Sequence, residues 1–175
     1  MSTGSKQTRA TSDSIDETIA IGQHIGRALR GGDVVFLDGD LGAGKTTLTK
    51  GIALGLGHPE VRNVTSPTFV LVQSYACADG LVLNHVDAYR LEDGYDLVEI
   101  GGDDLLGPGS VTVIEWPERI EGMVTAPWLT IRLANAPTGP PDRRTFDLEV
   151  HKEHSENDLS RIEQLFEALS EDSPR

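Results

Sequence analysis

The sequence has a single cysteine, Cys77, and few cations. One cysteine cannot form an internal disulfide, so we expect a thiol packed at the core and no disulfide-linked partner. There are 15 Lys and Arg against 28 Asp and Glu, a formal net charge of −13. Broad binding to nucleic acid or to an anionic membrane needs clustered cations, so this balance argues against both.

Long apolar runs are also missing. No stretch approaches the ~18 apolar residues of a membrane helix, and residues 1–12 are polar, without the apolar core of a signal peptide. We therefore expect a cytoplasmic protein that does not contact a membrane. Glycine, by contrast, is abundant at 19 of 175 residues, above the usual ~7%. The excess calls for tight turns or close backbone contacts.

The length and the order of the patterns predict one α/β domain. We expect a disordered tail over residues 1–13, the domain over 14–150, and an extension over 151–175 with one helix from about Ser155. Ser14 and Glu17 have the spacing of a helix capping box. The apolar face predicted for the helix that follows comprises Ile15, Ile19, Ile25 and Leu29.

Alternating helix and strand patterns continue along the chain. The predicted strands are 33–37, 69–74, 81–87, 111–116, 129–133 and 145–150, and the predicted helices are 45–56 and 96–106. Asp79-Gly80 is typical of a hairpin turn. Together these elements indicate a mixed parallel and antiparallel sheet flanked by helices.

The most specific motif is Gly39–Thr46, GDLGAGKT, which matches G-x-x-x-x-G-K-[ST] at every defined position. A buried strand precedes it and an amphipathic helix follows, which is the context that the motif requires. A purely structural glycine turn would not need Lys and Thr at the start of the helix. The motif therefore predicts a site for nucleotide phosphates.

Each residue type in this loop has a chemical reason. Glycines let the backbone wrap closely around phosphates, and the start of the helix adds unpaired N–H groups and a positive dipole end. We expect the ammonium group of Lys45 on the β- and γ-phosphates, the hydroxyl of Thr46 on Mg²⁺, and Thr47 near the α-phosphate. The predicted nucleotide-binding residues are Gly42, Ala43, Gly44, Lys45, Thr46 and Thr47.

Two carboxylates end apolar strands and are expected beside this loop. Asp87 closes LVLNHVD and Glu115 closes VTVIE. Ligands collect at the carboxyl ends of parallel strands, so these acids are candidates for holding Mg²⁺ and orienting water, although spacing does not say which does which. His85 should lie on the same face as Asp87, as a proton carrier, a metal ligand or a hydrogen-bonded structural residue.

Two further segments have both a functional and an ordinary interpretation. Ser66-Pro67-Thr68-Phe69 could sense the γ-phosphate or form a simple turn. Residues 87–104 carry seven acids against one base, which is typical of a solvated face and also suits a basic partner.

Taken together, the motifs resemble the TsaE family of bacterial P-loop ATPases in tRNA threonylcarbamoyladenosine synthesis. The resemblance covers about residues 14–150. It is carried by TIAIG at 18–22, GDLGAGKTT at 39–47, SPTF at 66–69, HVDAYRL at 85–91 and IEWP at 114–117. The combination is more specific than the phosphate loop alone, which fits many enzymes.

This resemblance implies a more detailed function. It implies that the loop binds ATP, that Thr46 and Glu115 hold Mg²⁺, and that Asp87 is the catalytic residue for hydrolysis. It also implies that residues 14–18 lie near the base, and that Arg143 and Arg144 occupy a hairpin where the family has basic residues. The implied partners are TsaB and TsaD, which carry the tRNA, so contact with tRNA would be indirect. ATP hydrolysis would reset that complex.

Two other functions stay open from the residues alone. A small-molecule kinase would need an acceptor site and phosphate-clamping arginines, and the chain has few arginines near its motifs. A nucleotide-dependent docking module uses the same residues as a slow ATPase. A GTPase is disfavoured because the sequence has no N-K-x-D motif.

Overall fold

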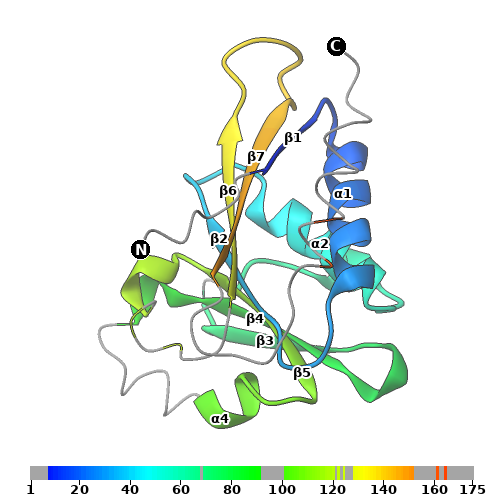
Figure 1. The fold of residues 1–175 in the computed structure, drawn as a ribbon, viewed down its shortest axis with the longest axis vertical. Coiled ribbons are helices and arrows are strands. Elements are labelled where there is room, and N and C mark those ends of the chain that lie inside the picture. Colours follow the sequence, from blue (N-terminus) through cyan, green and yellow to red (C-terminus); the bar gives the residue numbers. More distant parts are fainter. Residues whose placement is uncertain are drawn as a thin grey trace.

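The computed structural model describes residues 8–67, 69–91, 101–120, 122, 124, 128–151, 161 and 164. Its centre is a seven-stranded sheet in the order β1-β7-β6-β2-β5-β4-β3 (Figure 1). The strands are β1 Thr8–Ser12, β2 Val34–Asp38, β3 Val72–Ala76, β4 Val82–Asp87, β5 Ser110–Glu115, β6 Trp128–Asn135 and β7 Arg144–His151. The described helices are α1 Ile15–Ala28, α2 Lys45–Gly55 and α4 Gly102–Leu105, with 3₁₀ turns at Val61–Asn63, Ala78–Gly80, Ala88–Arg90 and Pro117–Arg119.

The middle of the sheet is parallel and its margins are antiparallel. Strands β6, β2, β5 and β4 run in the same direction, whereas β7 pairs antiparallel with β6, β1 with β7, and β3 with β4. The predicted mixed α/β sheet is therefore confirmed. The four parallel strands bring their carboxyl ends to one edge, which is where such sheets place ligands.

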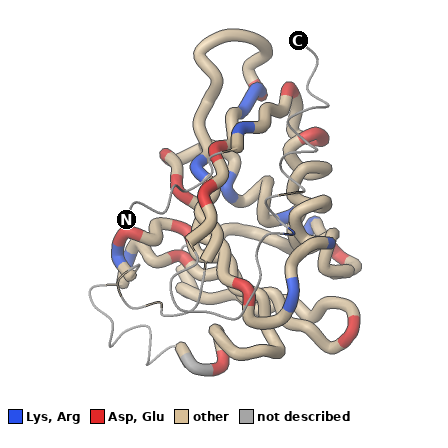
Figure 2. Tube along the Cα trace, viewed as in Figure 1, with Lys and Arg blue, Asp and Glu red and all other residues tan. Residues whose placement is uncertain are grey.

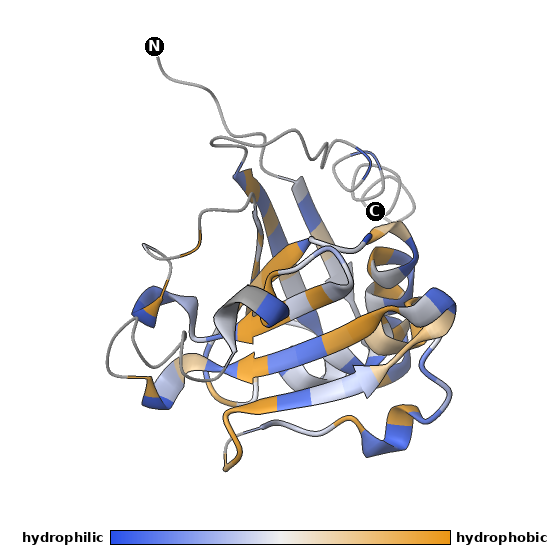
Figure 3. Ribbon diagram, turned by 90° about the horizontal axis from the view of Figure 1, so that it is seen from below, coloured by the Kyte–Doolittle hydropathy of each residue, from blue (hydrophilic) through white to orange (hydrophobic). Residues whose placement is uncertain are grey.

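The sheet separates two apolar cores. Along β2, Val35 and Leu37 belong to the core beneath α1 and α2, while Val34 and Phe36 belong to the core on the opposite face. Strands buried on both faces are apolar without interruption, which explains the run that predicted β2. Figure 3 colours the elements by hydropathy and shows hydrophobic stretches along the strands of the sheet.

Helices α1 and α2 cross in direct backbone contact. A methyl group on Gly22 would lie 2.4 Å from the carbonyl oxygen of Leu48, and one on Gly26 would lie 2.3 Å from that of Ile52. The same holds in reverse, because Gly51 and Gly55 face the backbone of α1 at 2.2 and 2.3 Å. Much of the glycine excess therefore lies in this helix pair.

The start of α1 follows the predicted capping pattern. The Ser14 hydroxyl accepts a hydrogen bond from the Glu17 backbone N–H at 3.2 Å, and the Glu17 carboxylate accepts one from the Asp13 N–H at 2.7 Å. The predicted apolar face is only partly right. Ile15 is 53% exposed, whereas Gly22 and Gly26 are buried.

The prediction of a disordered tail over residues 1–13 is wrong for Thr8–Ser12, which form β1 at the edge of the sheet. Ala10 pairs with Phe146 of β7, and both are buried. Arg9 adds an ion pair with Asp147 at 2.6 Å. The small polar residues of this segment have no apolar run, and they become a strand because β7 provides the backbone partners.

Both predicted hairpins are confirmed. Strands β3 and β4 pair antiparallel around Asp79 and Gly80, whose φ angles of 57° and 76° suit a tight hairpin turn. The first strand begins at Val72 rather than at the predicted residue 69. Strands β6 and β7 form the second hairpin over their whole length.

The remaining predictions are tested in part. Of the predicted helix over 96–106, the described portion is α4, and residues 92–100 lie outside the described residues. The C-terminal helix also lies outside them except for two helical residues, Arg161 and Gln164. In the part of the chain that the structure describes, no helix is both long and apolar enough to cross a membrane.

Cys77 is half-buried and packs against the core beside α2. Its Sγ donates to the backbone carbonyl of Tyr75 at 3.5 Å. Burial raises the pKa of the thiol above its usual value, and a protonated thiol is a poor nucleophile. This environment fits the prediction that Cys77 is a thiol packed at the core.

Candidate nucleotide-binding site

The loop between β2 and α2 depends on backbone angles that favour glycine. Gly39, Gly42 and Gly44 have φ angles of 154°, 81° and 104°. Gly39 also lies so close to β6 that a methyl group there would be 2.5 Å from the carbonyl oxygen of Leu133. The predicted loop thus lies at the carboxyl edge of the parallel strands, at the point where β2 ends.

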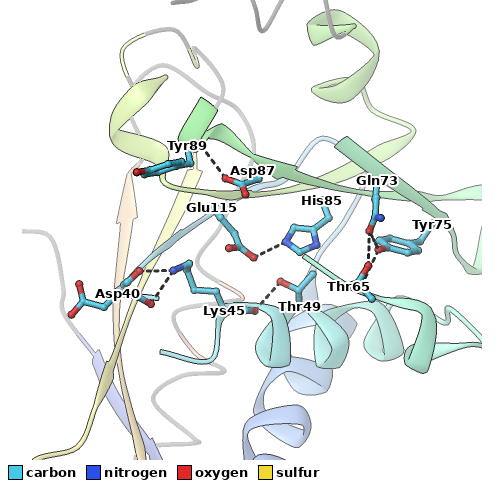
Figure 4. Close-up of polar contacts among 11 residues, drawn as sticks. Asp40, Lys45, Thr49, Thr65, Gln73, Tyr75, His85, Asp87, Tyr89 and Glu115 are labelled. Carbon is cyan, nitrogen blue, oxygen red and sulfur yellow. Dashed lines mark hydrogen bonds and ion pairs between the residues drawn. The ribbon is translucent and has the colours of Figure 1, made fainter. Parts of the chain in front are cut away.

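Lys45 is folded back into this loop. Its side chain is buried, and its Nζ donates to the carbonyl oxygens of Gly39 and Asp40, the latter at 3.1 Å (Figure 4). The ammonium also lies 4.3 Å from the centre of the Trp116 ring. The loop therefore encloses one positive charge. Among the described residues, only carbonyl dipoles and one aromatic face stabilise it.

The first turn of α2 has no side-chain cap. Its N-cap residue is Gly44, which has no side chain, and the first turn contains no acid. Thr46 and Thr47 are half-buried in this turn. Uncapped N–H groups at the positive end of an 11-residue helix attract an anion, so the local electrostatics agree with the motif.

The two predicted acids lie on neighbouring strands at the same edge. Asp87 and Glu115 are register partners of β4 and β5, and each is only 4% exposed. Asp87 Oδ1 accepts a hydrogen bond from the backbone N–H of Tyr89 at 3.0 Å. Figure 4 shows both carboxylates above the start of α2. The structure therefore brings together the phosphate loop and the acids that the sequence placed beside it.

His85 is the hydrogen-bond partner of Glu115. Its Nε2 lies 2.8 Å from Glu115 Oε1, and both side chains are buried. The other ring nitrogen, Nδ1, is buried without a hydrogen-bond partner. The tautomer with the proton on Nε2 satisfies this arrangement, because Nε2 then donates to the carboxylate and no N–H is left unpaired. Among the alternatives left open from the sequence, this geometry favours the hydrogen-bonded structural residue.

Aromatic and cationic side chains surround the site. Trp116 follows β5 with a left-handed φ of 59°, and its ring contacts the ring of Tyr89 at a centroid distance of 5.4 Å. The guanidinium of Arg90, in the turn that follows β4, lies 5.4 Å from the centre of the Phe69 ring. Trp116 is half-buried and lies between Lys45 and Tyr89.

Large apolar side chains are exposed at this rim. Leu41 of the phosphate loop is 91% exposed, and Phe69 is 88% exposed. Val70 and Tyr89 are also more than half exposed. We call Leu41, Phe69, Val70 and Tyr89 the apolar rim. Sequence reasoning missed most of it, because a single apolar residue in a loop carries no periodic signal.

Other predicted residues are resolved in part. Ser66 is exposed and Pro67 begins a turn, with its carbonyl accepting from Val70 and Leu71 N–H groups at 3.0 and 2.9 Å. Thr68 lies outside the described residues. In the acidic run, the four acids Glu92, Asp93, Asp96 and Glu99 also lie outside them. No group of three or more His, Cys, Asp or Glu side chains in the described residues is arranged to hold a metal ion by itself.

The chain is similar in sequence to proteins of a known family. The family model for "Threonylcarbamoyl adenosine biosynthesis protein TsaE" matches residues 12–145. A Streptomyces coelicolor protein named tRNA threonylcarbamoyladenosine biosynthesis protein TsaE is 46% identical over 118 residues, 66% of this chain and 78% of that protein. A Treponema pallidum protein of the same name is 42% identical over 125 residues, 71% of this chain and 90% of that one.

A solved structure has the same fold. The crystal structure of Bacillus subtilis YdiB superposes with a TM-score of 0.69 at 32% identity, covering 97% of this chain and 98% of that chain. The similarity therefore extends over nearly the whole of both chains.

Proposed function

The chain belongs to the TsaE family, with a role in tRNA threonylcarbamoyladenosine biosynthesis, and on this basis we propose that it is a Mg²⁺-dependent ATPase of that pathway. The observation that carries the proposal is the loop Gly39–Thr46, with Lys45 buried inside it and an uncapped helix behind it. Such a loop suits the phosphates of a nucleotide.

Thr46 and Glu115 are the residues that we propose to hold Mg²⁺. Mg²⁺ takes oxygen ligands, usually one or two from the protein and the rest from phosphates and water. A hydroxyl at the start of α2 and a buried carboxylate at the end of β5 supply oxygens of this kind. Bound Mg²⁺ would neutralise charge on the phosphates during hydrolysis.

Asp87 is the residue that we propose to orient the attacking water. One of its oxygens accepts the Tyr89 N–H, which fixes the carboxylate at the end of β4 next to Glu115. A carboxylate held in this way accepts a hydrogen bond from water and aims it at a phosphate. This division of labour between the two acids follows the family resemblance.

TsaB and TsaD are the partners that we propose, with tRNA contacted through them. The apolar rim supports a partner at the nucleotide site, because exposed aromatic and aliphatic side chains around a site are typical of protein interfaces. A net charge of −13 disfavours broad direct contact with tRNA. A reaction on tRNA also implies a cytoplasmic location.

Phosphate release tests the proposal. We expect slow release from ATP with the protein alone and faster release when TsaB, TsaD and tRNA are added, because hydrolysis would reset that complex. Asp87→Asn should bind ATP but release no phosphate above background. Absence of ATP binding by the wild-type protein, or phosphate transferred to a metabolite, would contradict the proposal.

The second candidate is a docking module that uses ATP binding alone, and the exposed side chains of the apolar rim favour it. Threonylcarbamoyladenosine formation over several turnovers separates the two functions. An Asp87→Asn protein that sustains repeated turnover would favour docking, whereas one that stops after about one turnover would favour hydrolysis.

A further inference from the structure

An acidic side chain is buried in the turn between α1 and β2. Asp33 directly precedes β2 and is only 2% exposed. Its Oδ2 accepts a hydrogen bond from the backbone N–H of Arg30 at 2.7 Å. Figure 2 shows basic and acidic positions along the chain between the end of α1 and the start of β2. A buried carboxylate is costly unless a cation pairs with it, so this turn requires a positive charge.

The positive charge comes from a residue far away in the sequence. Arg161 donates from Nη2 to Asp33 Oδ2, although 128 residues separate the two. Among the described residues, Arg161 is the only cation that forms an ion pair with Asp33. Arg27 and Arg30 are much closer in the sequence, but both are exposed and neither guanidinium pairs with this carboxylate.

The same guanidinium also contacts the end of α1. Arg161 Nε donates to the backbone carbonyl of Ala28 at 2.7 Å, and Ala28 is the last residue of the helix. The last carbonyls of a helix have no partner within it and form the negative end of its dipole, which favours a cation. A carboxylate and a helix-end carbonyl therefore converge on one side chain. A guanidinium can donate to both from different nitrogens, whereas an ammonium has only one.

We propose that Asp33 and the Ala28 carbonyl form a docking site for a guanidinium group, and that Arg161 occupies it to anchor the segment after β7 on the domain. Strand β7 ends at His151, and Arg161 brings the later chain back to the turn before β2. The site lies at the amino end of β2, whereas the phosphate loop follows its carboxyl end. The inference therefore does not depend on the proposed ATP binding.

Thermal melts of the full chain test the site with Arg161→Ala, which removes the guanidinium and leaves Asp33 buried without a cation. We expect the melting temperature to fall by about 5 °C, because a buried carboxylate loses its partner. Arg161→Lys should recover only part of this loss. Asp33→Asn removes the charge that Arg161 meets. Adding Arg161→Ala to Asp33→Asn should therefore lower the melting temperature much less than Arg161→Ala does in the wild type.

Addition of methylguanidinium tests the chemistry of the site directly. At about 20 mM, which is too dilute to denature a protein, it should raise the melting temperature of Arg161→Ala by about 2 °C relative to the same concentration of sodium chloride. The wild type should not respond, because Arg161 already fills the site. The double variant with Asp33→Asn should not respond either. Absence of this rescue in Arg161→Ala would overturn the assignment of a guanidinium site.

Proteolysis tests whether Arg161 anchors the segment after β7. A glutamate-specific protease can cut after Glu163, which is close to Arg161 in the sequence. We expect Arg161→Ala to be cut there about tenfold faster than the wild type, because cleavage follows the population of the detached segment. Mass spectrometry of the fragments measures the rate. An unchanged rate would show that Arg161 does not hold the segment, and the inference would be wrong.

Arg27→Ala is the matched control, because Arg27 is an arginine in the last turn of α1 that does not pair with Asp33. It should melt like the wild type, be cut after Glu163 at the wild-type rate and show no response to methylguanidinium. If Arg27→Ala loses as much stability as Arg161→Ala, the effect would belong to any positive charge near the end of α1. That result would contradict a specific docking site.

Discussion

Two groups of glycines lie near α2 and serve different purposes. One group is in the loop that precedes α2, and the other is where α1 and α2 cross. The loop glycines Gly39, Gly42 and Gly44 have positive φ angles, and around Gly42 there is no atom within 4 Å of where a side chain would begin. The helix glycines have ordinary helical angles, but a methyl group on any of them would lie 2.2–2.4 Å from a backbone oxygen. The helix glycines are Gly22, Gly26, Gly51 and Gly55.

The difference separates positioning from binding. Close backbone contact at these glycines leaves no room for a side chain between α1 and α2 there, so α2 is held directly against α1. The loop glycines leave backbone N–H groups accessible at the end of that helix. The first group decides where the start of α2 lies, and the second decides what can approach it.

Removal of the Lys45 ammonium tests whether the loop binds phosphates, and it should have the largest effect. Lys45→Ala takes away the only ammonium held inside the loop among the described residues. We expect ATP affinity to fall about 1,000-fold, or about 4 kcal/mol, as measured by calorimetry, with the thermal midpoint little changed. Lys50→Ala on the same helix is the control and should bind normally. Near-wild-type affinity of Lys45→Ala would contradict the assigned site.

Substitution of a helix glycine tests the positioning side. Gly26→Ala places a methyl group 2.3 Å from the Ile52 carbonyl, so the helices must separate, and we expect a loss of about 3 kcal/mol in unfolding free energy. Gly42→Ala meets no neighbour and strains only its φ angle, so about 1 kcal/mol is expected. Urea unfolding measures both. Equal losses would show that the two groups of glycines do not differ in this way.

The same comparison explains what the sequence could predict. The phosphate loop, Asp87 and Glu115 were predictable because motif spacing and strand ends are local signals. The buried face of α1 was only partly predictable, because periodicity counts apolar side chains and cannot recognise a contact made by Gly22 and Gly26. Strand β1 was missed since its partner, β7, lies at the other end of the domain.

Contacts between distant segments were not predictable for the same reason. Arg144 reaches Gly44 only after β6, β7 and β2 are assembled in one sheet. His85 was expected on the Asp87 side of β4, but its bond to Glu115 depends on the parallel register of β4 and β5. Sequence patterns indicate which face a residue occupies, and pairing between strands then decides what it meets.

Loss of the His85 contact should affect the metal more than the nucleotide. His85→Gln removes the imidazole that holds Glu115 Oε1. Partners of this kind typically contribute ten- to hundredfold to metal affinity, so we expect the Mg²⁺ concentration for half-maximal hydrolysis to rise about tenfold. Binding of ADP without Mg²⁺ should not change. His24→Gln, an exposed position on α1, is the control. An equal loss of metal-free ADP binding would indicate a general structural defect instead.

The smallest effect is expected from the ion pair between Asp13 and Arg143. The hydrogen bond from Arg143 lowers the pKa of Asp13 below its ordinary value of 3.8. A carboxylate with a lowered pKa in the folded state stabilises that state above its unfolded pKa, and the contribution is lost as the pH falls through the folded value. The difference in melting temperature between the wild type and Asp13→Asn should therefore be small, constant near pH 7, and absent well below 3.8. Thermal melts of both proteins across this range measure it. Because the pair is at the surface, salt should reduce this difference in melting temperature. A difference that persists unchanged at low pH and high salt would mean that Asp13 acts through contacts other than its charge.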